Sequence, residues 1–140
     1  MNAVCETTRI CYSADMAVPE YLDLLGLPFV RGGRTIEEGL DCYGLAIEMF
    51  RRDGVRIPDF DSPGTLELME ALISAKSAEW RKVPLGTIKS IVTLRVEGLG
   101  AHVGYMIAPD RFIHTIKATG VTTERLTNGS IRPIASYVYE

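Results

Sequence analysis

The chain has 140 residues, which is enough for one domain with a hydrophobic core, and 46% hydrophobic and 24% charged residues are typical of an ordinary globular protein. A net charge of −3 disfavours nucleic acid as a partner, because nucleic acid requires a basic face. No apolar stretch of about 18 residues exists, so no membrane-spanning helix is expected. Residues 1–11 lack the basic-then-apolar layout of a signal peptide, so we expect a chain made in the cytoplasm with reduced cysteines.

The hydrophobic pattern predicts little regular secondary structure before residue 41. Residues 1–15 are weakly patterned and are predicted to form an N-terminal arm. A short helix is expected over Val18–Leu25, because a proline suits its first turn and glycine follows its end. The irregular stretch after it contains the pair Gly32-Gly33, which predicts a turn and allows a neighbouring group to approach the backbone closely.

The clearest helix signal starts at Asp41, whose carboxylate can cap a helix that begins at Cys42. Apolar residues recur at four-residue spacing from Leu45, two arginines occupy the last turn, and Gly54 is suited to terminate the helix. Cys42 therefore lies at the positive end of a helix, where the pKa of a thiol is expected to fall and the reactive thiolate becomes available. The alternative interpretation is a small hydrophobic side chain in the core.

A second amphipathic helix is predicted over residues 65–78, with Trp80 packed where this helix meets the sheet. Beyond residue 83 the pattern changes to β-branched segments separated by turn signals. Strands are predicted at residues 87–96, 101–108, 111–117, 121–126 and 131–139. Helices followed by an antiparallel meander predict a single α+β domain over residues 1–140, with N-terminal helices packed on a C-terminal five-stranded sheet.

The chain has two histidines, His102 and His114, on neighbouring predicted strands. A two-residue loop between these strands would place the histidines on opposite faces of the sheet, whereas a three-residue loop or a bulge would place them diagonally on one face. In the second case one imidazole can orient the other, as a cysteine nucleophile requires of its base and orienting residue. The alternatives are two unrelated histidines, or a zinc site that these residues form with Cys42.

Several of these segments resemble the NlpC family of papain-like cell-wall cysteine peptidases. The matching residues are Phe29, Gly32-Gly33, Gly39-Leu40-Asp41-Cys42, Gly44-Leu45, Ala101-His102-Val103-Gly104-Tyr105 and Arg111-Phe112-Ile113-His114, within residues 20–140. The resemblance implies a papain-like fold, a Cys42 nucleophile, a His102 base and a His114 orienting residue, with no metal or cofactor. The implied reaction cuts γ-D-glutamyl–diamino acid bonds of peptidoglycan stem peptides through a thioacyl-enzyme.

Two residues depart from the usual pattern of this family. Phe29 stands where tyrosine is common, so one hydrogen bond to the substrate is missing or comes from another group. Tyr43 stands where serine is common, so the substrate pocket is expected to be reshaped. Together with Asp41 and Gly104, these two residues are the expected substrate-binding positions.

The bulky residue after the cysteine and the missing export signal resemble the phage-tail branch of the family, whose proteins leave the cell within a virion or by lysis. Phage tail proteins are then expected partners beside the stem peptide, and the cell wall is the expected place of action. Two alternatives stay open: a non-catalytic tail or assembly component with this fold, and a cysteine-dependent deamidase or acyltransferase that acts on protein. Arg31 and Arg34 are nearby cations, for which solvation at the surface is the simpler interpretation.

Overall fold

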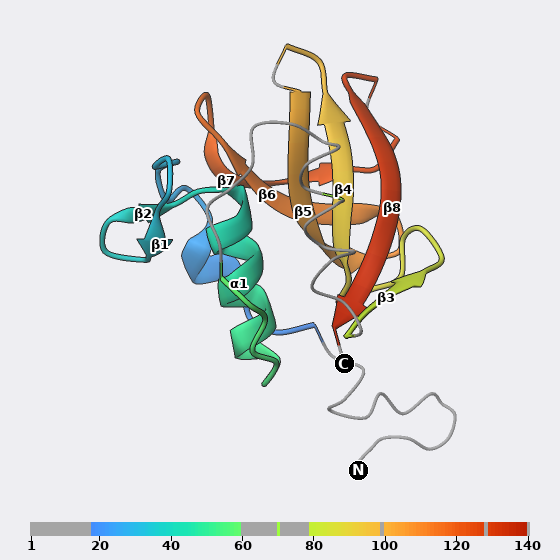
Figure 1. The fold of residues 1–140 in the computed structure, drawn as a ribbon. Helices are drawn as coiled ribbons and strands as arrows, with labels where there is room; N and C mark the ends of the chain where they lie inside the picture. The colour runs from blue at the N-terminus through green and yellow to red at the C-terminus, as the bar shows by residue number, and fades with distance from the viewer. Residues whose placement is uncertain (1–17, 60–69, 71–78, 99, 128, 140) are drawn as a thin grey trace, which may run out of the picture.

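The computed structural model describes residues 18–59, 70, 79–98, 100–127 and 129–139. Within these residues one α-helix packs on a six-stranded antiparallel sheet (Figure 1), which confirms the predicted α+β class. The predicted strand count was one too low, because residues 80–83 add a short strand that pairs with the end of the chain. The N-terminal arm and, apart from residue 70, the helix predicted over residues 65–78 lie outside the described residues.

The sheet has the strand order β3-β8-β4-β5-β6-β7. Its strands are β3 (Trp80–Val83), β4 (Ile91–Val96), β5 (Gly100–Ala108), β6 (Arg111–Ile116), β7 (Gly120–Arg125) and β8 (Ile131–Tyr139). The predicted meander is therefore correct for β4 to β7 and wrong for the last strand, which crosses the sheet to pair with β4 instead of β7. A two-stranded ribbon of β1 (Arg34–Thr35) and β2 (Gly39–Leu40) leads into the helix α1 (Cys42–Arg52). The helix predicted over residues 18–25 is only a short 3-10 helix, η2 (Leu22–Leu24), and the chain turns after it at Gly26, where φ is 87°.

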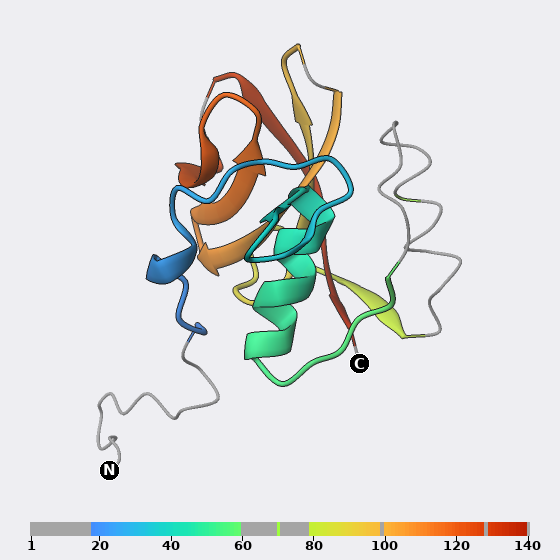
Figure 2. The ribbon, with the colours of Figure 1, turned by 90° about the vertical axis from the view of Figure 1, so that its left-hand side faces the viewer.

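Helix α1 begins and ends at the predicted residues. The Asp41 carboxylate accepts a hydrogen bond of 2.7 Å from the backbone N–H of Gly44, as an N-cap does. At the other end Gly54 has a φ of 81°, and its N–H donates to the carbonyl of Arg51 at 2.9 Å. Figure 2 shows α1 lying across one face of the sheet. No helix among the described residues is long and apolar enough to cross a membrane.

The sheet separates two hydrophobic clusters, because alternate side chains of each strand point to opposite faces. The cluster on the α1 side includes Phe50 of the helix, whose ring meets the ring of Tyr105 edge-on at 5.1 Å. On this side β5 and β6 also contribute Val103, Ile107 and Ile113. The cluster on the far side consists of Val92, Leu94, Val96, Met106, Phe112, Leu126 and Ile131.

Strands β5 and β6 are paired over only part of their length. Their register runs from Tyr105↔Ile113 to Ala108↔Arg111, with a bulge between Met106 and Ala108. Residues 100–104 of β5 pair with β4 but not with β6. A bulge is one of the two arrangements that were expected to place both histidines on one face of the sheet. At residues 102 and 114 the strands β5 and β6 are not paired with each other.

Candidate active site

The two histidines meet in the interior. The Nε2 atom of His102 lies 2.9 Å from Nδ1 of His114, which is a hydrogen bond, and the two rings stand nearly edge to face at 77°. Both side chains are buried, His102 with 5% and His114 with 1% of its surface exposed. The predicted same-face arrangement is therefore confirmed. Cross-strand pairing of His102 with Leu94 places both imidazoles on the sheet face away from α1.

Cys42 reaches β5 from the helix side. It is the first residue of α1, only 9% of its surface is exposed, and the backbone of Val103 is close enough to hydrogen-bond to its sulfur. Val103 directly follows His102, in the section of β5 that has no partner in β6. The fold thus brings Cys42 to the strand that carries His102. Among the described contacts, none is a hydrogen bond between the thiol and either imidazole.

The electrostatics of this group differ from the sequence prediction. Burial raises the pKa of the Cys42 thiol to about 11, backbone hydrogen bonding to Val103 opposes this rise, and the neighbouring Asp41 carboxylate adds to it. The expected decrease at the helix N-terminus was wrong, because the loss of hydration outweighs the helix dipole. Burial, followed by the charge of His114, lowers the pKa of His102 to about 3. At neutral pH the site therefore holds a neutral thiol and a neutral imidazole.

A buried carboxylate ties the helix start to the ribbon before it. Asp41 accepts hydrogen bonds from Gly32 N at 3.0 Å and Arg34 Nη1 at 2.7 Å, besides the Gly44 cap. Arg34 also donates to Asp59 at 2.8 Å. Its guanidinium is thus part of the support of the site, and the expectation that it is merely solvated was wrong. No local sequence pattern identifies this residue, because its partners lie 7 and 25 positions away.

The four residues expected to bind substrate occupy different environments. Phe29 is half-buried and forms an isolated bridge with Leu40, whereas Asp41 is buried in the network above. Tyr43 has no exposed surface, and its hydroxyl donates to the carbonyl of Pro58 at 2.5 Å. Gly104 is also buried. In this conformation Phe29 alone among the four presents a partly exposed side chain.

A further acidic residue, Glu124, lies beside the histidine pair. One of its carboxylate oxygens is 3.7 Å from Nε2 of His114. The sequence-based prediction missed Glu124, although strand alternation could have placed it on the same face as His114 once the β6–β7 register was known. The described residues contain no group of three or more His, Cys, Asp or Glu side chains that could hold a metal ion. The described residues therefore offer no set of ligands for the alternative of a zinc site.

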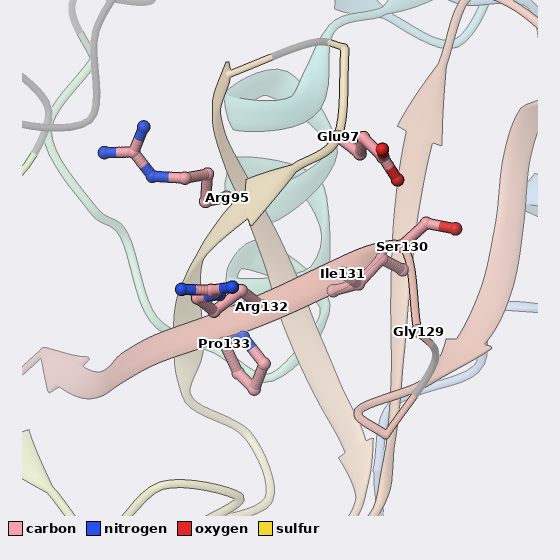
Figure 3. A pocket seen from close by; sticks show the side chains of 7 residues that line it. All are labelled: Arg95, Glu97, Gly129, Ser130, Ile131, Arg132 and Pro133. Atoms are coloured by element: carbon pink, nitrogen blue, oxygen red, sulfur yellow. The ribbon is translucent and has the colours of Figure 1, made fainter.

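A cavity of about 520 Å³ lies elsewhere, at the end of β4 and the start of β8 (Figure 3). It is lined by Arg95, Glu97, Gly129, Ser130, Ile131, Arg132 and Pro133. Arg95 and Arg132 are direct cross-strand neighbours there. Neither Cys42 nor the histidines line this cavity, so it is separate from the candidate active site.

No protein-family model and no curated protein matches the chain. Among solved structures it is similar to the NlpC/p60 domain of the peptidoglycan hydrolase SagA, with a TM-score of 0.55 and 18% identity over 83% of this chain and 90% of that one. It is also similar to an NLP/P60-family protein, described as similar to lipoprotein, from Staphylococcus aureus subsp. aureus Mu50. That match has a TM-score of 0.52 and 17% identity over 77% of this chain and 34% of that one. The chain thus has the fold of NlpC/p60 domains, which confirms the fold expected from the sequence resemblance.

Proposed function

We propose that this protein is a cysteine peptidase that hydrolyses γ-D-glutamyl–diamino acid bonds in peptidoglycan stem peptides. The observation that carries the proposal is the buried hydrogen bond between His102 of β5 and His114 of β6, with Cys42 against the backbone of Val103 in the same β5. The fold is shared with the NlpC/p60 domain of a peptidoglycan hydrolase, which supports the substrate class. A cysteine at a helix start, a histidine base and an orienting group are the parts that thiol acyl transfer needs.

In the proposed first step, the Cys42 sulfur attacks the carbonyl carbon of the scissile amide while a nitrogen of His102 takes the thiol proton. Cys42 and the imidazoles approach β5 from opposite faces, so this transfer has to pass the section of β5 that has no partner in β6. Nε2 of His102 is already engaged with His114, so Nδ1 is the nitrogen left to act as base. Because burial favours the neutral forms of both groups, the proton moves as the carbon–sulfur bond forms, and no thiolate–imidazolium pair is stored beforehand.

The carbonyl oxygen becomes negatively charged in this step. The backbone N–H of Cys42, at the positive end of α1, is the proposed donor to that oxygen. Collapse of the tetrahedral intermediate breaks the carbon–nitrogen bond, and His102 returns its proton to the leaving amine. Water then attacks the thioester with His102 as base, which releases the glutamyl acid and restores the thiol.

The test is the digestion of purified sacculi, with released muropeptides identified by mass spectrometry. Wild type should release fragments with a new γ-D-glutamyl carboxyl end, and Cys42→Ala should release none. A Cys5→Ser/Cys11→Ser variant is the control and should remain as active as wild type. Binding without release by wild type would favour the non-catalytic component, and equal release by Cys42→Ala would refute the proposal. A changed protein substrate with untouched sacculi would favour the deamidase or acyltransferase.

A further inference from the structure

One ring nitrogen of His114 has no hydrogen-bond partner in the described part of the chain. Nδ1 is bonded to His102, but Nε2 is buried and unpaired among these residues. The polar group next to this nitrogen is the carboxylate of Glu124, at 3.7 Å. Glu124 extends from β7 on the same sheet face, because it is paired with Phe112, two residues before His114. The separation exceeds a hydrogen bond by less than 1 Å, and such contacts often tighten when a substrate binds.

A single proton is shared between the two facing imidazole nitrogens when both rings are neutral, which leaves two arrangements. In the first, His102 donates from Nε2, its Nδ1 carries a lone pair, and His114 carries its other proton on Nε2. In the second, His114 donates from Nδ1, so His102 carries a proton on Nδ1 and cannot act as a base from that atom. The second arrangement also points a bare His114 Nε2 at the carboxylate of Glu124.

We propose that Glu124 is a positioning residue that selects the first arrangement. An ionised carboxylate can only accept hydrogen bonds, so it attracts a protonated Nε2 of His114 and repels a bare one. The proton on Nε2 forces His114 to accept from His102 through Nδ1. His102 then keeps the lone pair on Nδ1 that takes the thiol proton of Cys42. This inference rests on the proposed function, because it assigns the protonation state that the reaction requires.

The other charges around His114 agree with this assignment. Among the described residues, the titratable groups that contact His114 on this sheet face are His102 from β5 and Glu124 from β7, and the ring of Phe112 lies against the imidazole. Burial lowers the pKa of His114, whereas the nearby carboxylate of Glu124 raises it. A neutral His114 whose Nε2 proton points at Glu124 is consistent with both effects: burial disfavours the charged imidazole, and the carboxylate attracts the N–H.

The test is the tautomer of each imidazole, measured by long-range ¹H–¹⁵N correlation in ¹⁵N-histidine-labelled full-length protein near pH 7.5. The chain has only two histidines, so the spectrum contains only these two rings. Wild type should show both rings protonated at Nε2. In Glu124→Leu and Glu124→Gln, a second set with both rings protonated at Nδ1 should appear. Wild-type rings protonated at Nδ1, or spectra unchanged in the folded variants, would overturn the proposal.

The tautomers are read without turnover, so this result is independent of whether the protein cleaves peptidoglycan. Where cleavage is measured, Glu124→Leu should lower kcat on the order of tenfold with little change in KM, because the base is present in only part of the molecules. The matched control is Glu97→Leu, which removes the same charge from an exposed position at the end of β4 and should leave both the spectrum and kcat unchanged. An equal loss of kcat in both variants would contradict the assigned role.

Discussion

Arg34 and Asp41 form an ion pair with 2.7 Å between Nη1 and Oδ1, although only 3% of the Asp41 side chain is exposed. The pair joins the first residue of β1 to the N-cap of α1, and the same carboxylate holds two backbone N–H groups. The start of the helix, and with it the position of Cys42, is therefore fixed by one buried charge whose donors include Gly32, Arg34 and Gly44.

Replacing this carboxylate should destabilise the protein far more than replacing the other acidic partner of Arg34. Asp41→Ala removes a helix cap and leaves a partly buried guanidinium without its buried partner, so the free energy of unfolding should fall by about 3 kcal/mol. Asp59→Ala removes an exposed partner of the same arginine and should cost less than about 0.5 kcal/mol. Urea denaturation followed by circular dichroism measures both values. Similar losses in the two variants would contradict the role given to Asp41.

Gly44→Ala should also be destabilising, because a Cβ atom there would lie 2.2 Å from the carbonyl oxygen of Gly33. Backbone would have to shift to relieve this clash, at a cost of about 1–3 kcal/mol beyond the gain in helix propensity. Gly129→Ala is the matched control, because a Cβ atom added there would have no neighbour within 4 Å, and it should change stability by less than about 0.5 kcal/mol. Thermal unfolding of both variants checks this, and an unchanged melting temperature in Gly44→Ala would count against the close approach.

Stability should fall as the pH is lowered from 7 to 5. The pKa of His102 is about 3 in the folded protein and about 6.5 when unfolded, so below pH 6.5 the unfolded chain binds a proton that the native protein does not. The resulting loss is about 2 kcal/mol at pH 5, and the lowered pKa of His114 acts in the same direction. In His102→Gln/His114→Gln this loss should be largely absent. Equal pH dependence of the free energy of unfolding in both proteins would contradict the buried, neutral state of the pair.

Alkylation of Cys42 by iodoacetamide should accelerate steadily from pH 6 to pH 10 without a plateau. Burial raises the pKa of this thiol to about 11, so the thiolate fraction keeps growing over the whole range. The measurement uses Cys5→Ser/Cys11→Ser protein, so that one thiol reacts. The same protein unfolded in urea is the control and should show a midpoint near about pH 8.5. An alkylation rate that already reaches a plateau at pH 6–7 in the folded protein would show that Cys42 is a thiolate at neutral pH. It would contradict the neutral forms assigned to Cys42 and His102.

The features of this structure that depend on neighbouring residues in the chain could be predicted from the sequence. The capped helix from Cys42 and the strands β4 to β7 follow from spacing and turn residues, whereas the bulge that puts both histidines on one face and the place of β8 beside β4 do not. The raised pKa of the thiol could not be predicted in this way, because it depends on how deeply the helix start is buried against β5. The contacts of Arg34 and Glu124 were missed for a related reason: each requires the register between segments that the sequence does not pair by itself.

The central claim is that Cys42 forms a thioacyl intermediate, and partitioning to hydroxylamine tests it most directly. A synthetic γ-D-glutamyl–diamino acid peptide is incubated with wild type or Cys42→Ala in the presence of hydroxylamine, and the products are identified by mass spectrometry. We expect a γ-D-glutamyl hydroxamate beside the free acid with wild type, and neither product with Cys42→Ala. Free acid formed without any hydroxamate, or hydrolysis that persists in Cys42→Ala, would contradict the claim.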